Sequence, residues 1–341
     1  MLNFVNDYCE AAHPDILRRI TQTNMEQLPG YGSDHYCDEA KAKIRQVCDA
    51  PDADVRFLVG GTQTNQTVID TITPPWAGVV ASTSGHVNVH EAGAIEFSGH
   101  KVLTIPSHEG KMDAKELDAF CADFYADGNH THMVFPGCVY ISQSTEYGTL
   151  YTKAELEAIA AAAHKYDIPL FLDGARLGYA LAAEGNDLTL QDIARITDVF
   201  SIGGTKVGAL FGEAIVFTKG NTPSHLTTQI KQHGALLAKG WLLGLQFDTL
   251  FTDGLYTHIA ANADMQASRI RAALKDKGYR LVFENTTNQT FVVMDGPTVD
   301  RLGKDVKFDF VTKYDDAHTI MRICTSWATT DEHVDRLLEL L

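Results

Sequence analysis

Short apolar segments alternate with helix-like segments through the first two thirds of the chain, and this alternation most restricts what the chain can fold into. Five apolar segments have the length and composition of buried strands: residues 55–60, 133–142, 167–174, 198–204 and 212–219. Between them, residues 66–72 and 153–166 have helical patterns, and Leu156, Ile159 and Ala163 fall on one helical face. The alternation predicts an α/β fold with a mostly parallel sheet that helices cover on both sides.

The pattern changes after about residue 245. A long helical segment, residues 256–279, is followed by several strand-like segments and by a final helix over residues 331–341. The strand-like segments are residues 281–285, 289–295, 308–314 and 319–328. This order predicts a smaller α+β domain over residues 246–341, after a large domain over residues 1–245 that includes the N-terminal segment.

Charge and cysteine content exclude some classes of partner. The chain has 28 Lys and Arg against 44 Asp and Glu, a net charge of −16, which argues against nucleic acids and anionic membranes as main partners. Six cysteines lie scattered with no CxxC pair, and neither a secretory signal nor a membrane-spanning run is present. We therefore expect a reduced, cytoplasmic protein.

Lys206 stands in an apolar, glycine-rich stretch, DVFSIGGTKVGALFG (residues 198–212). A buried ammonium is costly, so such a lysine tends to be neutral or paired, and a lowered pKa makes it a nucleophile for Schiff-base chemistry. The alternative is a loop lysine whose amine reaches the solvent. Companion residues have to decide between the two.

Two further segments end predicted strands, as Lys206 does. Asp173 follows the apolar run 167–172, where it is either a buried site carboxylate or the N-cap of the next helix. The segment GGTQTN, residues 60–65, opens a helix whose first N–H groups could bind a phosphate. The carboxyl ends of strands in such sheets gather ligands, so these segments predict one shared site. Neither a P-loop nor a dinucleotide-binding fingerprint is present.

The motifs, in their order, resemble the pyridoxal-phosphate (PLP) enzymes of the aspartate-aminotransferase fold type, most closely the threonine aldolases of the β-eliminating lyase family. The resemblance runs from VNDY near residue 5 to MRICTSW near residue 325. It rests on GYGSDHYCDEAKAKI (30–44), GGTQTNQ (60–66), GHVNVHEAGA (85–94), LDGARL (172–177) and the Thr205-Lys206 pair. It implies a fold-type-I large domain and a smaller C-terminal domain.

The resemblance also implies a role for each matching residue. Lys206 would form the Schiff base with PLP, Asp173 would hold a proton on the pyridine nitrogen, and His86 would stack on the ring. Gly61, Thr62 and Thr205 would contact the phosphate. Arg176, beside the cofactor, and Arg322 would hold the substrate carboxylate and orient the breaking Cα–Cβ bond.

Two positions depart from the family pattern. In SQSTEYGTLY, residues 142–151, Glu146 stands where the family has a histidine that assists the base at the β-hydroxyl. Desolvation could raise the pKa of Glu146 enough for it to act as that base; the other candidate is His86. Asn6 stands where many members have a serine that helps to bind the carboxylate.

The resemblance predicts a lyase that cleaves a β-hydroxy-α-amino acid, such as threonine or allo-threonine, to glycine and an aldehyde. Other PLP-dependent reactions remain open: β-elimination, racemisation and transamination. From other classes, the chain could be a non-catalytic binding protein, or a hydrolase whose metal is bound by His86, His90 and Glu91. That spacing is not HExxH and lacks a third characteristic ligand, so no metal is expected.

The fold type further implies a homodimer or homotetramer with sites at the subunit contacts. A basic residue of one subunit would reach the phosphate of its neighbour. Three candidates lie in the corresponding segment: Lys231, His233 and Lys239. The sequence does not choose among them.

Overall fold

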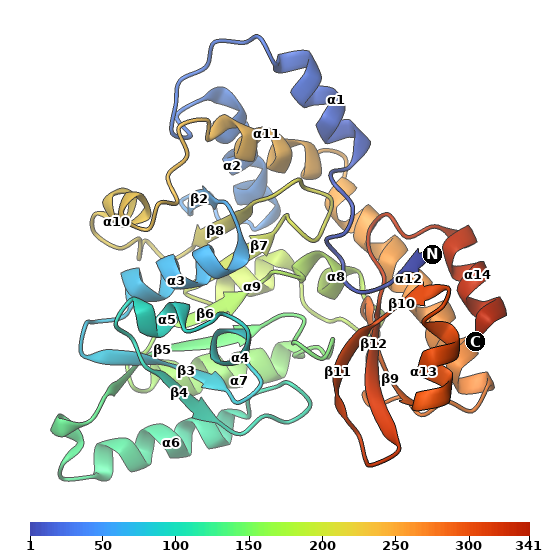
Figure 1. Ribbon diagram of the computed structural model, residues 1–341. Helices are drawn as coiled ribbons and strands as arrows, with labels where there is room; N and C mark the ends of the chain where they lie inside the picture. The colour runs from blue at the N-terminus through green and yellow to red at the C-terminus, as the bar shows by residue number, and fades with distance from the viewer.

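The computed structural model describes residues 1–341, and its larger part is built around a seven-stranded sheet (Figure 1). The strands lie in the order β2-β8-β7-β6-β5-β3-β4, and only β8 runs antiparallel to its neighbours. They are β2 (Asp54–Leu58), β3 (Ala77–Ser82), β4 (Val102–Ile105), β5 (Phe135–Ser142), β6 (Leu170–Asp173), β7 (Val199–Gly203) and β8 (Glu213–Phe217). The predicted α/β fold with a mostly parallel sheet is confirmed.

Helices cover both faces of this sheet. Two neighbouring residues of β5 pack on opposite faces. Val139 packs against the layer formed by α6 (Ala114–Ala126), α7 (Lys153–His164) and α9 (Leu190–Ile196), whereas Tyr140 packs against the opposite layer. That opposite layer consists of α3 (Gly61–Ile72), α4 (His86–Val89), α5 (Ala94–Phe97) and α10 (Leu226–Gln232). The near-continuous apolar strands predicted from the sequence are therefore buried on both faces.

A helical layer closes the β2 end of the sheet. It contains α1 (Pro14–Thr23), α2 (His35–Val47) and α11 (Trp241–Leu250). A Cβ on Gly244 would lie 2.5 Å from Cys37 Cα, so glycine permits the close approach of α11 to α2. Because α11 runs through residue 245, the division expected there would cut a helix; we propose that the larger part ends after α11.

The smaller part is a three-stranded antiparallel sheet covered by helices (Figure 1). Its strands are β9 (Gln289–Asp295), β11 (Asp309–Lys313) and β12 (His318–Cys324), in the order β11-β12-β9. The helices are α12 (Leu255–Asp276), α13 (Gly296–Leu302) and α14 (Asp331–Leu340). Two short elements, α8 (Leu177–Ala182) and the 3-10 turn η1 (His130–His132), belong to the larger part.

The first residues of the chain lie with the smaller part. Strand β1 (Leu2–Asn3) pairs in parallel with β10 (Val306–Lys307), and Phe4, only 2% exposed, packs into the core of the smaller part. Both ends of the chain accordingly lie beside this part in Figure 1. The expectation that the N-terminal segment belongs to the larger part does not match this pairing.

One predicted strand is wrong. Residues 281–285 form no strand and make only an isolated bridge between Leu281 and Val292. Phe283 instead stacks on Tyr147 of the larger part, and the side chain of Asn285 donates to the Tyr147 carbonyl. The apolar character of the segment serves a contact between the two parts rather than a sheet.

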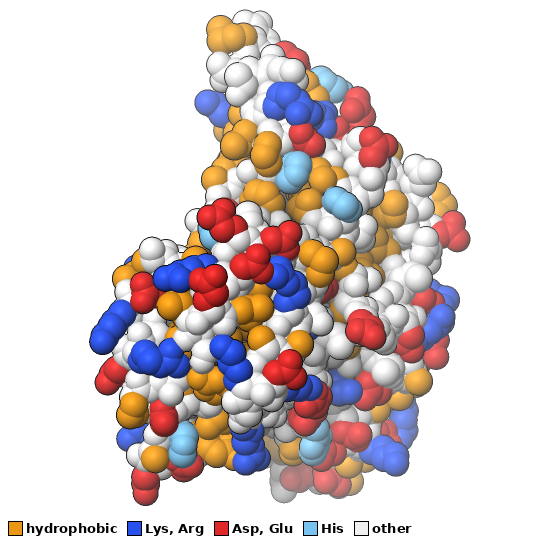
Figure 2. All heavy atoms as spheres, turned by 90° about the vertical axis from the view of Figure 1, so that its right-hand side faces the viewer, with side chains coloured by type: hydrophobic (Ala, Val, Ile, Leu, Met, Phe, Trp, Pro, Cys, Tyr) orange, Lys and Arg blue, Asp and Glu red, His pale blue; other side chains and the backbone are white.

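The surface mixes both signs of charge. Figure 2, which faces the smaller part, shows basic and acidic side chains interspersed on this face. Arg269, for example, forms ion pairs with Asp331 and Asp335. No helix is both long and apolar enough to span a membrane. None of the six cysteines forms a disulfide.

Candidate active site

A pocket lies at the carboxyl ends of the central strands, as predicted for the shared site. It brings together six of the residues singled out from the sequence: Gly61, His86, Glu146, Asp173, Arg176 and Lys206. Asn65, Ser142, Ser144 and Ala175 complete its lining. Thr62, Thr205, Arg322 and Asn6 do not line it, and the following paragraphs give their positions.

Asp173 ends β6 as a buried carboxylate held by three donors. Its Oδ2 accepts from Asn65 Nδ2 at 2.8 Å and from the Tyr140 hydroxyl at 2.7 Å, and its Oδ1 accepts from the main-chain N–H of Ala175 at 2.8 Å. It does not cap the following helix, whose N-cap is Arg176. Three donors fix the carboxylate in position.

Asn65 joins Asp173 to a second buried carboxylate. The two hydrogens of its Nδ2 are divided between Asp173 and Glu91, whose Oε1 lies 2.7 Å away. The same oxygen of Glu91 lies 2.8 Å from His86 Nδ1. Because a carboxylate only accepts, His86 Nδ1 donates in this contact, and in the neutral imidazole the lone pair is therefore on Nε2.

Lys206 lies in the loop between β7 and β8. Its main-chain carbonyl accepts from the Tyr179 hydroxyl, while its amine has no hydrogen-bond partner. Burial, together with the charge of Arg176, lowers the pKa of the Lys206 amine. The neutral amine is therefore favoured more than in water, as a Schiff-base nucleophile requires.

Glu213, which starts β8, is a buried carboxyl in the same region that the sequence did not suggest. Burial raises its pKa to about 8, although Thr205 and Lys206 act in the opposite direction. This shift favours the neutral form of the Glu213 carboxyl over its carboxylate.

The start of α3 could bind an anion. Its first N–H groups have no intrahelical acceptor, and no side chain caps them. A Cβ added at Gly60 or Gly61 would meet no atom within 4 Å, so open space lies beside this turn. Thr62 is exposed on the same turn, whereas Thr205 accepts from Gly212 N at 3.0 Å across the Lys206 loop.

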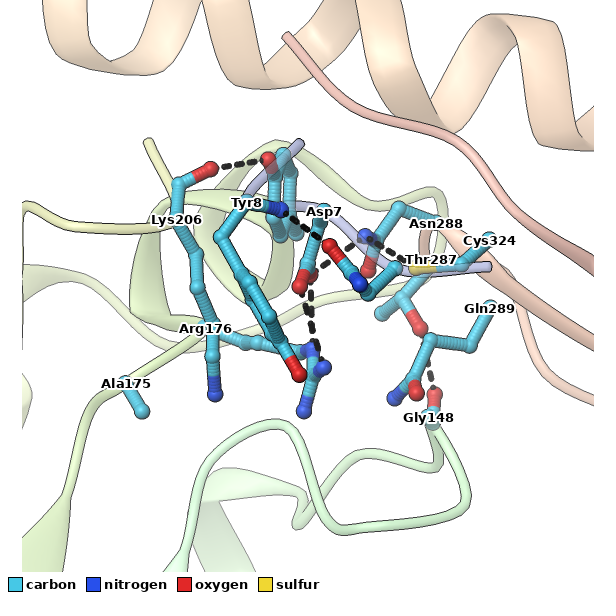
Figure 3. A network of polar contacts seen from close by, with 12 residues as sticks. Asp7, Tyr8, Gly148, Ala175, Arg176, Lys206, Thr287, Asn288, Gln289 and Cys324 are labelled. Carbon is cyan, nitrogen blue, oxygen red and sulfur yellow. Dashed lines mark hydrogen bonds and ion pairs between the residues drawn. The ribbon is translucent and has the colours of Figure 1, made fainter. Parts of the chain in front are cut away.

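Arg176 forms a bidentate ion pair with Asp7, a fully buried residue of the N-terminal segment. Arg176 Nε and Nη2 lie 2.7 and 3.1 Å from the two Asp7 oxygens, and Asn288 of the smaller part also donates to Asp7 at 2.9 Å. Burial would raise the pKa of Asp7, but the charges of Arg176 and Lys206 and these hydrogen bonds lower it overall. Figure 3 shows Lys206, Tyr8 and Arg176 projecting in the same direction, toward the loop with Gly148.

Arg322 and Asn6 lie outside the pocket lining. Arg322 donates to Asp309 Oδ2 at 2.6 Å and to Gln289 Oε1 at 3.1 Å, while its buried Nε has no partner. Asn6 accepts from the N–H of Tyr8 and so shapes the turn that presents Asp7 and Tyr8. Of the two predicted carboxylate-binding arginines, only Arg176 reaches the pocket lining.

Glu146 is placed between two donors. Its Oε1 accepts from the main-chain N–H of His86 at 2.8 Å and from the Ser142 hydroxyl at 2.7 Å. Burial nevertheless dominates and raises the pKa of the Glu146 carboxyl. A partly buried carboxyl with a raised pKa, at the pocket wall, has the properties of a general base.

His86 and His90 do not form a metal site with Glu91. Their rings lie 5.7 Å apart, centroid to centroid, and Glu91 is engaged by Asn65 and His86. No group of three or more His, Cys, Asp or Glu side chains could hold a metal ion.

Several site residues could not be singled out from the sequence: Asp7, Asn65, Tyr140, Glu213 and Gln289. Asn65 is the last residue of the segment GGTQTN, and its place in that segment is the only sequence signal for it. The others stand in apolar or featureless surroundings and meet the site only through folding.

The described residues fit PLP. Asp173 offers a fixed carboxylate for a protonated ring nitrogen. Lys206 offers an amine that has no hydrogen-bond partner and a lowered pKa. Helix α3 offers uncapped N–H groups with open space beside them. A phosphate suits the start of α3, since helix N-termini bind anions. These donors and acceptors match the parts of the cofactor.

Comparison with known proteins leads to the same family. The beta-eliminating lyase family model matches residues 11–297. The low specificity L-threonine aldolase of a Pseudomonas species is 28% identical over 337 residues, which cover 98% of this chain and 95% of that protein. The solved structure of Leishmania major threonine aldolase has 43% identity and a TM-score of 0.97, with 100% of this chain and 98% of that one covered.

A more distant comparison shows the fold alone. The serine palmitoyltransferase of Sphingomonas wittichii has 13% identity and a TM-score of 0.73, with 99% of this chain and 85% of that one covered. Fold, pocket and family match agree on the class of chemistry. The chain belongs to the beta-eliminating lyase family, and it is a PLP-dependent lyase of fold type I.

Proposed function

We propose that this lyase cleaves β-hydroxy-α-amino acids, such as threonine and allo-threonine, to glycine and an aldehyde. The relatives named as threonine aldolases support this substrate class. The observation that carries the proposal is Glu146: a partly buried carboxyl with a raised pKa in the same pocket as Lys206 and Asp173.

The residues that would hold PLP are those of the pocket and its rim. Asp173 would hold the ring nitrogen, His86 would face the ring, and Lys206 would hold the aldehyde carbon. Gly61, Thr62 and Thr205 would hold the phosphate. PLP, when bound, supplies an electron sink for the Cα of an attached amino acid.

The arginines orient the substrate. Arg176 uses Nε and Nη2 for Asp7, so its Nη1 is left to bind the α-carboxylate at the pocket wall. Arg322 would support this carboxylate site from behind, and Asn6 would shape its edge. A fixed carboxylate determines which bond at Cα stands perpendicular to the ring, and so which bond breaks.

Glu146 is the proposed base. Its carboxylate takes the proton from the β-hydroxyl oxygen; a carbonyl forms at Cβ as the Cα–Cβ bond breaks, and the bonding pair stays with Cα. A proton returned to Cα gives glycine, so no net proton is consumed. His86, whose Nε2 carries a lone pair, is the second candidate for this step, and the Glu91 contact holds its tautomer.

The products identify the reaction. Purified protein loaded with PLP should release acetaldehyde and glycine in equal amounts from allo-threonine. Ammonia or a keto acid without aldehyde would indicate β-elimination or transamination instead. Loss of chirality without any new product would indicate racemisation.

We also propose a cytoplasmic homodimer or homotetramer with the pocket near the subunit contact. The unpaired cysteines support the location. For the contact to the neighbouring phosphate, Lys231 and Lys239 are exposed, whereas His233 is engaged with Asp70 at 2.7 Å. Light scattering after size exclusion tests the assembly: a monomer at micromolar concentration would overturn it.

A further inference from the structure

The loop that carries Glu146 is held from outside the larger part. It connects β5 to α7, and its main-chain carbonyls accept hydrogen bonds from a segment of the smaller part, Phe283–Gln289. Asn285 Nδ2 donates to the Tyr147 carbonyl at 2.8 Å, and Thr287 Oγ1 donates to the Gly148 carbonyl at 2.9 Å. Consecutive carbonyls of the loop are thus fixed by side chains more than 130 positions later in the chain.

Packing reinforces these hydrogen bonds. The ring of Tyr147 stacks on Phe283, with centroids 4.4 Å apart and planes at 13°, and meets Phe291 edge-on. Gly148 has a φ of 74°. A Cβ there would lie 2.6 Å from Thr287 Oγ1, so the loop and the segment fit without room for one more carbon.

Gln289 extends this contact to Arg322. It is completely buried, and Figure 3 shows its side chain beside Thr287 and Gly148. Gln289 Nε2 donates to the Glu146 carbonyl at 3.5 Å, a long hydrogen bond, and Gln289 Oε1 accepts from Arg322 Nη1 at 3.1 Å. One side chain therefore contacts both the main chain of the proposed base and the arginine behind the carboxylate site.

We propose that Gln289 is a positioning residue that couples Arg322 to the Glu146 loop, so that the carboxylate site and the base keep a fixed relative position. The inference rests on the proposed function, in which Glu146 is the base. A buried amide with both ends engaged suits this task, because an apolar side chain of similar size would leave Arg322 Nη1 and the Glu146 carbonyl without partners.

Three variants test the coupling in the full-length, PLP-loaded protein. Gln289→Met keeps the volume and removes both hydrogen bonds, and Gln289→Glu keeps only the acceptor toward Arg322. Thr290→Val is the matched control: Thr290 is the next residue of β9, is equally buried, and its hydroxyl has no partner.

Gln289→Met should lower kcat/KM for allo-threonine about tenfold, the effect of one or two lost hydrogen bonds. It should also move the acidic limb of the pH profile to lower pH, since a loosened loop lets water reach Glu146. Gln289→Glu should lower kcat while KM stays within about twofold, because only the link to Glu146 is lost. Thr290→Val should change neither.

The outcomes separate the coupling from the function beneath it. If Gln289→Met and Gln289→Glu both keep the wild-type kcat/KM and pH profile, the coupling is overturned. If Gln289→Met does not fold, Gln289→Glu decides alone, and an unchanged kcat overturns the inference. If instead Glu146→Gln is as active as the wild type, the proposed base is wrong, whatever Gln289 does.

Discussion

The two carboxylates of the pocket are held in different ways. Asp173 is fixed by Asn65, Tyr140 and the N–H of Ala175, all of which belong to the larger part. Glu146 receives donors from Ser142 and His86 at its side chain, but its loop is fixed by the smaller part, through Asn285 and Thr287. The residues of this chain that would hold the cofactor, here called the cofactor wall, all belong to the larger part. The residues that would act on the substrate, here called the substrate wall, depend on both parts for their position.

This difference teaches where such a fold can vary. A cofactor wall built inside one sheet can keep its chemistry while the opposite wall changes. The opposite wall depends on how the smaller part packs, so substitutions in Phe283–Gln289 can change the reaction without touching PLP. Variants on the two walls should therefore differ in whether they affect cofactor binding or only turnover.

Lys206→Ala should have the largest effect. Without its nucleophilic amine the protein should lose about a thousandfold or more of its activity. It should also lose the visible absorption band that PLP gives with the wild type, and Lys313→Ala, at an exposed lysine, should keep both. A borohydride-reduced adduct on another lysine would show that the cofactor wall is assigned wrongly.

Asp173→Asn should follow, as the test of the cofactor wall. The amide keeps the shape but not the charge that would hold a proton on the ring nitrogen, so kcat should fall about a hundredfold to a thousandfold. PLP should bind more weakly, as measured by fluorescence titration. Unchanged kcat with weakened binding would mean that Asp173 only anchors the cofactor.

Glu146→Gln tests the substrate wall. It should lower kcat about a hundredfold with PLP affinity unchanged, because a general base is lost and no cofactor contact is. Since the base works only when deprotonated and burial raises its pKa, wild-type kcat/KM should fall as the pH drops through a value above that of an ordinary glutamate. The variant should lack this acidic limb; if the limb persists, another group, such as His86, is the base.

Asp264→Asn should have the smallest effect on catalysis. It changes the free energy of unfolding without touching the pocket, and so separates effects on stability from effects on turnover. Asp264, on α12, is buried with both oxygens unpartnered, and burial raises its pKa from the ordinary 3.8 to about 9. Between these values the folded protein holds a proton that the unfolded chain has released, so stability falls as the pH rises through this window.

The Asp264→Asn side chain has no proton to release, so the loss of stability with rising pH disappears. The free energy of unfolding at pH 8 should rise by about 1 to 3 kcal/mol, and its slope between pH 4 and pH 9 should flatten. In denaturant titrations the gain should shrink toward pH 4, while kcat stays within about twofold. If kcat changes as much as in Glu146→Gln, variants on the substrate wall lower kcat through general stability and not through the local position of the base.

The sequence predicts the cofactor wall better than the substrate wall, for a physical reason. Asp173, Lys206 and Gly61 follow strands whose carboxyl ends share one edge, so local pattern and topology place them together. Phe283 lies in an apolar segment that fits a strand, and Gln289 begins the strand β9. Only tertiary packing shows that both contact the Glu146 loop. Asp7 lies in the VNDY segment, but no local pattern identifies its partner, because Arg176 is 169 positions away.

The pairing of β1 with β10 has a consequence for how the enzyme is made. Leu2 and Asn3 leave the ribosome long before Val306 and Lys307, with which they pair, and Asp7 leaves it long before Asn288, which donates to it. The N-terminal segment that carries the counter-ion of Arg176 can therefore reach its final contacts only after the smaller part has been made. We expect a nascent chain that ends before residue 288 to be inactive, even if its sheet has formed.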